Sequence, residues 1–98
     1  MFPNDRQVAP RLFDVVQDIR REGGAVRRYG NAFMSAQVES DSENRFFLSV
    51  DVLDGDDLVM ERKGLVCPTA EEALVGSMWL LDEAITTFVT AHLFGDSL

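Results

Sequence analysis

The sequence of 98 residues predicts a single α+β domain, in which two helices pack on one face of a three-stranded antiparallel meander. Apolar residues recur at helical spacing over residues 10–22 and again over residues 69–93. The segment between them shows the alternation that is typical of strands. Short turn sequences separate these strands, so successive strands are expected to run antiparallel. The length fits one domain, with residues 1–9 expected to be loose.

The first helix is expected over residues 10–22. Pro10 suits the first helical position, because the N–H that proline lacks would be unpaired there in any case. Gly23 and Gly24 are expected to end the helix after two arginines that suit the negative end of its dipole. Its apolar stripe consists of Leu12, Val15, Val16 and Ile19, and Val8 is in position to extend it.

Three strands are expected between the helices. The first lies within residues 26–40, where the alternation of residue types begins. The second, residues 45–53, is the clearest, because its apolar side chains fall on one face and its polar side chains on the other. The third covers residues 58–66. Residues 41–44 and 54–57 supply turn-forming side chains between the strands.

The second helix is expected to begin after Thr69, which forms a capping box with Glu72, and to continue to about Leu93, a length of roughly 36 Å. Its apolar residues occupy about 260° of the circumference, whereas a helix packed on a sheet needs roughly 100°. One stripe, which includes His92, is expected to lie on the sheet, and the first helix is expected to cover the alanine-rich flank. The opposite flank is left for a partner and consists of Val75, Trp79, Val89 and Leu93.

A second copy of the chain is the expected cover for this flank, because twofold dimers are the commonest assemblies. Burial of the tryptophan and its aliphatic neighbours is worth roughly 5–8 kcal/mol. Two alternatives remain open at this point. A different protein covers the flank, or the first helix covers it within the same chain.

The formal net charge of −8 is unevenly distributed. Residues 1–28 hold six arginines and four acids, which gives +2, whereas residues 29–98 hold three basic and thirteen acidic residues, which gives −10. Such a surface repels phosphate and favours a basic protein partner over direct contact with nucleic acid, although charge also serves solubility alone. The residues expected to face the partner are Glu39, Asp41, Glu43, Asp51, Asp54, Asp56 and Asp57.

The basic residues of the N-terminal third gather around the Gly23-Gly24 turn. They are Arg20, Arg21, Arg27 and Arg28. These arginines are expected to pair with carboxylates of the same chain or of a second subunit. Contact with phosphate or with an acidic protein face is the alternative.

No motif specifies catalysis, a cofactor or a metal site, so a non-enzymatic protein is expected. The acids of residues 51–57 lack the spacing of a calcium-binding loop. Cys67 is expected to be a buried thiol, and His92 either a packed residue near the helix end or a charge at the negative end of the helix. A single cysteine forms no internal disulfide, and no apolar run reaches the roughly 18 residues that span a membrane. A cytoplasmic location is therefore expected.

The order helix, three strands, helix is similar to that of the double-stranded-RNA-binding domain over residues 10–93. That family contacts phosphate through a basic N-terminus of its second helix. Here the corresponding residues are Thr69, Ala70, Glu71 and Glu72, which would repel phosphate. The resemblance therefore implies a topology without this mode of binding.

In type, the chain resembles small acidic phage or bacterial inhibitors, which include anti-CRISPR proteins and many nucleic-acid mimics. The expected function is that of a homodimer that binds and inhibits or modulates a basic protein partner, with a nucleic-acid-binding protein as one candidate. The alternatives are a chaperone or adaptor that holds a peptide along the second helix, and a nucleic-acid binder that uses the arginines of residues 20–28.

Overall fold

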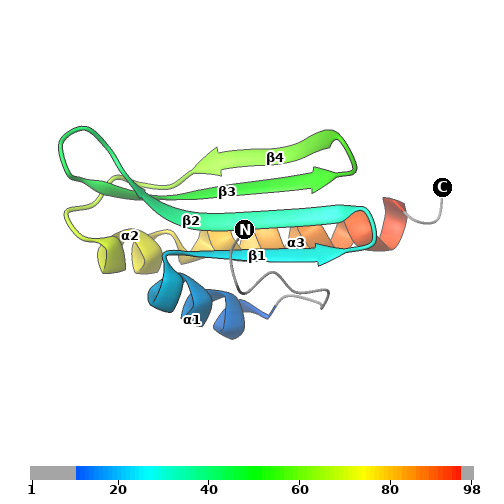
Figure 1. Ribbon diagram of the computed structural model, residues 1–98, viewed down its shortest axis with the longest axis horizontal. Coiled ribbons are helices and arrows are strands. Elements are labelled where there is room, and N and C mark those ends of the chain that lie inside the picture. The colour runs from blue at the N-terminus through cyan, green and yellow to red at the C-terminus, as the bar shows by residue number, and fades with distance from the viewer. Residues whose placement is uncertain (1–10, 96–98) are drawn as a thin grey trace.

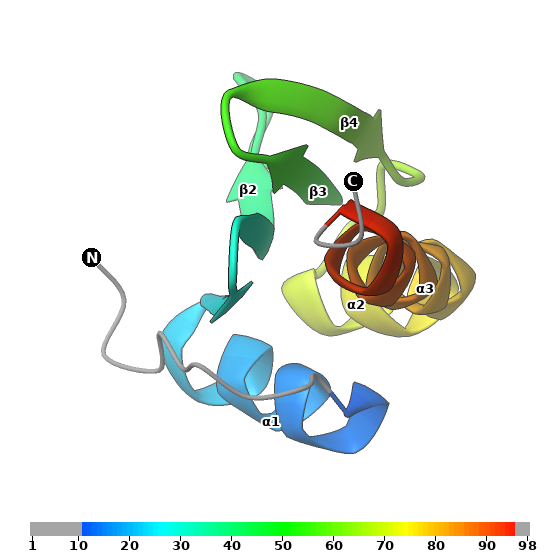
Figure 2. The same ribbon diagram turned by 90° about the vertical axis from the view of Figure 1, so that its right-hand side faces the viewer.

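The computed structural model describes residues 11–95, which form three helices and one four-stranded antiparallel sheet. The elements are α1 (Leu12–Glu22), β1 (Gly24–Tyr29), β2 (Ala32–Ser40), β3 (Phe46–Asp54), β4 (Asp57–Lys63), α2 (Ala70–Gly76) and α3 (Met78–Gly95). The strands form a meander in the order β1-β2-β3-β4 (Figure 1). The helices lie on one side of the sheet, which curves around α3 (Figure 2). The domain is thus α+β, as predicted.

The sheet has four strands, and the prediction of three was wrong. The segment 26–40 was expected to hold one strand, but it contains most of a hairpin, in which β1 pairs with β2 along its whole length. Gly30 and Asn31 make the turn, and Gly30 has a φ of 58°, which glycine adopts without strain. A Gly-Asn pair is a known hairpin signal. The two arginines of β1 interrupt the apolar–polar alternation by which a strand before this turn would have been predicted.

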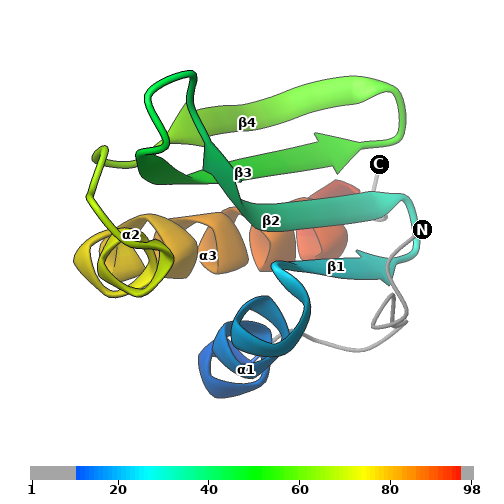
Figure 3. The same ribbon diagram turned by 60° about the vertical axis from the view of Figure 1, so that its left-hand side comes forward.

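The long second helix is also divided, because α2 ends at Gly76 and α3 begins at Met78. Ser77 stands between them and is fully buried. Its Oγ accepts a hydrogen bond from the backbone N–H of Leu65, 3.3 Å away, which ties the joint to the segment after β4 (Figure 3). The predicted cap at the start is confirmed, since Thr69 Oγ1 accepts a hydrogen bond from the Glu72 N–H at 3.1 Å.

The first helix begins at Leu12 and ends, as predicted, at Glu22. Gly23 has a φ of 84°, and its N–H donates to the Ile19 carbonyl over 2.8 Å, which closes the helix. Of the predicted stripe, Val15, Val16 and Ile19 are buried, whereas Leu12 is exposed. Val8 and Pro10 lie outside the described residues.

The core lies between the helices and the inner face of the sheet. Alternate side chains of the two central strands are fully buried there, as the pattern of residues 45–53 predicted. The main strand residues are Met34, Ala36, Leu48, Val50 and Val52, and the main helix residues are Ile19, Leu74, Leu80, Leu81, Ala84 and Phe88. Of the alanine-rich flank, Ala73, Leu80 and Ala84 are therefore buried and Ala91 is half-buried, and α1 makes contact with α3.

An ion pair inside the domain holds α1 against β1. Arg27 Nη2 donates to Asp18 Oδ2, and the two side chains are only 1% and 4% exposed. Arg21 also contacts this carboxylate, with its Nη2 3.2 Å from Oδ1. A carboxylate and a guanidinium out of water require this kind of mutual pairing, because either charge alone would be costly to bury.

Candidate protein-interaction surface

Four large apolar side chains are exposed around the joint between α2 and α3. Trp79 is 57% exposed, and Leu65, Val66 and Val75 are exposed to between 50% and 66%. Val75 and Trp79 flank Ser77 in the chain, and the hydrogen bond from Leu65 to Ser77 brings residues 65–66 to the same place. We call Leu65, Val66, Val75 and Trp79 the joint patch.

A bulge turns Leu65 and Val66 outward. Lys63 pairs with Ser49 and Cys67 with Phe46, so the three residues 64–66 stand opposite only residues 47 and 48 of β3. The extra residue bends the chain away from the ladder. Gly64 permits this path, since a Cβ there would lie 2.2 Å from Ser77 Oγ. The positions of Leu65 and Val66 in the joint patch thus depend on the close approach of the Gly64 backbone to Ser77.

The seam predicted along the second helix coincides with this patch only in part. Val75 and Trp79 belong to both, whereas Val89 is half-buried against the core. The side chains of Leu93 and His92 lie outside the described residues. Beyond Trp79, the exposed stripe of α3 is polar and consists of Asp82, Thr86 and Thr90.

Sequence analysis missed Leu65 and Val66 as surface residues. Both fall at the end of the third predicted strand, whose two faces each mix apolar and polar residues, so neither was assigned to the surface. Gly64 was expected to mark a bulge or the end of that strand, because a glycine inside a strand pattern often does so. Cys67, expected to be buried, is half-buried and pairs through its backbone with Phe46.

The seven acidic residues named from the sequence lie in three places. Asp54, Asp56 and Asp57 form or flank the β3–β4 turn, Asp41 and Glu43 lie in the β2–β3 turn, and Glu39 and Asp51 lie on the outer face of the sheet. The two turns are at opposite ends of the sheet (Figure 1). The acidic surface is therefore divided, and its parts have different surroundings.

The acidic residues of the β2–β3 turn bind groups of the same turn. Asp41 Oδ1 accepts hydrogen bonds from the backbone N–H groups of Glu43 and Arg45, each at 2.9 Å. The Arg45 guanidinium contacts both carboxylates, at 3.1 Å each. The hydrogen bond from the Arg45 backbone is the main cause that lowers the pKa of Asp41 below its ordinary value. These two acids stabilise the turn, and less of their charge is left for a partner.

On the outer face, Asp51 stands directly opposite Glu61 in the register of β3 and β4. Burial raises the pKa of Asp51, and the charges of Glu61 and Glu39 raise it further, while Lys63 acts against them. Two cations of the chain lie over rings of the sheet, Arg28 over Phe33 and Lys63 over Phe47, each 5.3 Å from the ring centroid.

The four arginines expected around the glycine turn do not share one surface. Arg27 is buried, Arg21 contacts Asp18, and Arg20 binds Glu71 of α2. Arg28 follows Arg27 in β1, so its side chain points to the opposite face of the sheet, where it lies over Phe33. Three of the four thus pair with carboxylates of the same chain, which was the expected arrangement.

Among the side chains that the structure describes, residues 11–91, no group of three or more His, Cys, Asp or Glu is arranged to hold a metal ion. None of the helices described has the length and apolar character needed to cross a membrane. No protein-family model, curated protein or solved structure matches the chain.

Proposed function

We propose that this protein is a non-enzymatic interaction module, which forms a homodimer through the joint patch and binds a basic protein partner that it inhibits or modulates. The exposure of Trp79 and of three aliphatic side chains around the same helix joint carries this proposal. Covering four side chains that are each about half exposed is worth on the order of 3–6 kcal/mol. Contiguous apolar patches rimmed by polar residues mark protein-binding sites.

A second copy of the chain suits the joint patch because of where the patch lies. The joint is at the end of the sheet opposite the β3–β4 turn (Figure 1). A dimer formed at the joint leaves the half-buried Asp54 and the exposed Asp56 and Asp57 at the far ends of both subunits. These carboxylates are then the part of the surface that attracts a basic partner, and that contact weakens as salt is raised.

The two alternative functions have less support. A peptide held along the second helix would lie on Asp82, Thr86 and Thr90, which offer no apolar groove. A nucleic-acid binder would need several arginines on one surface, but Arg27 is buried in an ion pair and Arg20 already holds Glu71.

Replacement of Trp79 by aspartate tests the homodimer. The native protein is expected to scatter light with twice the chain mass of 11.0 kDa, and Trp79→Asp with the mass of one chain. Thr90→Asp is the matched control, since it places the same charge on the exposed stripe of α3 away from the patch. Far-ultraviolet circular dichroism checks that each variant is folded, and Val75→Glu replaces Trp79→Asp if the latter is not. A native mass of one chain, or a Trp79→Asp protein that keeps the dimer mass, would overturn the proposal.

A further inference from the structure

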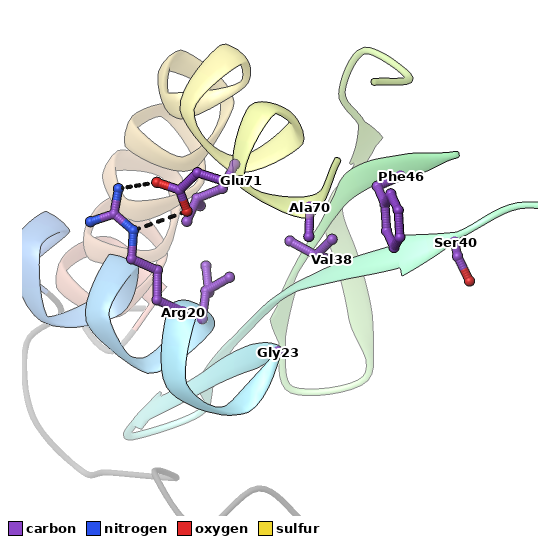
Figure 4. A pocket seen from close by; sticks show the side chains of 9 residues that line it. Arg20, Gly23, Val38, Ser40, Phe46, Ala70 and Glu71 are labelled. Carbon is purple, nitrogen blue, oxygen red and sulfur yellow. Dashed lines mark hydrogen bonds and ion pairs between the residues drawn. The ribbon is translucent and has the colours of Figure 1, made fainter. Parts of the chain in front are cut away.

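A pocket of about 590 Å³ opens between α1, the end of β2 and the start of α2 (Figure 4). It does not include the joint patch. Pockets that bind small molecules have volumes of roughly 300–1,000 Å³, so this one is large enough to hold a bulky side chain. Its apolar lining consists of Ile19, Val38, Phe46, Ala70 and Leu74.

An ion pair lies at one end of this pocket, and Phe46 and Ser40 lie at the other (Figure 4). Arg20 binds Glu71 through two hydrogen bonds, Nη2 to Oε1 at 2.6 Å and Nε to Oε2 at 3.2 Å. Arg20 is in the last turn of α1 and Glu71 in the first turn of α2, so each charge stabilises its own helix end. Both side chains are exposed, and exposed pairs of this kind contribute little to stability.

The edge of β2 beside the pocket offers backbone groups for pairing. The Val38 N–H donates to the Gly23 carbonyl over 3.0 Å, so the backbone groups of Val38 point toward the side of β1. In an antiparallel sheet the N–H and C=O groups of one residue point to the same side, and those of every second residue point to that side as well. The Val38 carbonyl and both backbone groups of Ser40 therefore face the side of β1. β1 begins only at Gly24, opposite Gln37. Within the described part of the chain, no strand runs beside residues 38–40 on this side.

We propose that this edge and the pocket together bind an extended segment of a partner polypeptide. The backbone of the segment pairs with the Val38 carbonyl and with both backbone groups of Ser40, which continues the line of β1 along β2. One apolar side chain of the segment enters the pocket between α1 and α2. In binding by strand addition, the backbone hydrogen bonds supply affinity and the pocket supplies specificity. The site goes beyond the proposed function, since it uses neither the joint patch nor the β3–β4 turn.

The chemistry around the pocket favours a segment with basic residues on both sides of the apolar one. Glu39 lies between the two β2 residues that line the pocket, and Glu22 precedes Gly23. Glu71 also lines the pocket, but its charge is balanced by Arg20, and Glu72 lies next to it in the chain. Together with the net charge of −8, these carboxylates attract a cationic peptide and repel an acidic one.

The probe for this site is a positional-scanning library of blocked, fluorescent heptapeptides with lysine at both ends, titrated with the full chain and read by anisotropy. We expect saturable binding by peptides with a large apolar residue at the centre. Methylation of those peptide nitrogens that face β2 is expected to lower the affinity by about tenfold or more, because it removes the backbone hydrogen bonds. Methylation of the alternate nitrogens is the matched control and should have little effect.

Two variants of the protein locate the site. Ser40→Pro removes the N–H that faces the edge, and Ala70→Phe fills the pocket; each is expected to weaken binding by about tenfold, whereas Ser40→Ala and Ala70→Ser keep it. The light-scattering mass should be the same for all four, so a failure here is separate from a failure of the proposed dimer. The inference is overturned if no library peptide binds saturably, or if binding is unaffected by both peptide methylation and the two variants.

Discussion

Arg27 and Arg28 are neighbours in the sequence, but they have different surroundings in the protein. Successive side chains of a strand point to opposite faces, so Arg27 reaches Asp18 in the interior and Arg28 lies over Phe33 on the outer face. A basic patch read from the sequence therefore separates into individual contacts. The sequence shows that the two side chains diverge, but which of them is buried depends on where α1 packs.

Asp51→Asn is expected to raise the free energy of unfolding by about 0.2–1 kcal/mol at neutral pH, because it removes a like charge directly opposite Glu61. Burial, followed by the charges of Glu61 and Glu39, raises the pKa of Asp51. The folded state thus binds the carboxyl proton of Asp51 more tightly than the unfolded state does. The ionised carboxylate costs stability above the unfolded pKa, and no cost remains below it.

Urea denaturation at about pH 7 and about pH 3 tests this expectation, since the Asp51 carboxyl group is ionised only at the higher pH. The advantage of Asp51→Asn over the native protein should be present at the higher pH and lost at the lower. Asp56→Asn is the control, because it removes the same charge from an exposed turn. A gain of equal size at both pH values would contradict this account of Asp51.

The break between α2 and α3 shows how a distant residue shapes a secondary-structure element. The apolar pattern continues through Gly76 and Ser77, which is why one helix was predicted. Ser77 is instead engaged by the segment after β4, where the Leu65 N–H reaches its Oγ and Gly64 approaches closely. This contact joins residues that are far apart in sequence, and it exposes Val75 and Trp79 next to Leu65 and Val66.

Gly64→Ala is expected to lower the free energy of unfolding by about 1–3 kcal/mol, because its Cβ would overlap the side chain of Ser77. The added carbon would lie 2.2 Å from Ser77 Oγ and 2.7 Å from its Cβ. Ser77→Gly in the same chain should recover part of the loss, which a double-mutant cycle in urea measures. Gly76→Ala is the control, since nothing lies within 4 Å of a Cβ there. Equal effects of Gly64→Ala and Gly76→Ala would refute the close contact.

On the scale of the whole molecule, the apolar and acidic surfaces have opposite effects on the association of two copies of the chain. Each chain carries a net charge of −8, so a dimer held by the joint patch brings like charges together. The apolar contact must overcome this repulsion, whereas association with a basic partner gains from the same charge. The response to salt therefore distinguishes the two associations.

Raising sodium chloride from about 0.1 M to about 1 M shortens the Debye length from about 10 Å to about 3 Å. The dissociation constant of the homodimer is expected to decrease, because the repulsion between two acidic chains is screened. Analytical ultracentrifugation at the two salt concentrations measures it. A homodimer that dissociates as salt is raised would indicate that ion pairs, and not the joint patch, hold the subunits together.

The sequence by itself determined the α+β class, the closure of α1 at Gly23, the alternation of β3 and the cap at Thr69, because each depends on residues within a few positions of one another. Only the tertiary structure decided the break at Ser77, the burial of Arg27 and the composition of the joint patch. It also decided the pocket beside the edge of β2. These features depend on which distant segments meet, and a periodic pattern contains no information on where another segment approaches closely enough to exclude water or to leave a side chain exposed.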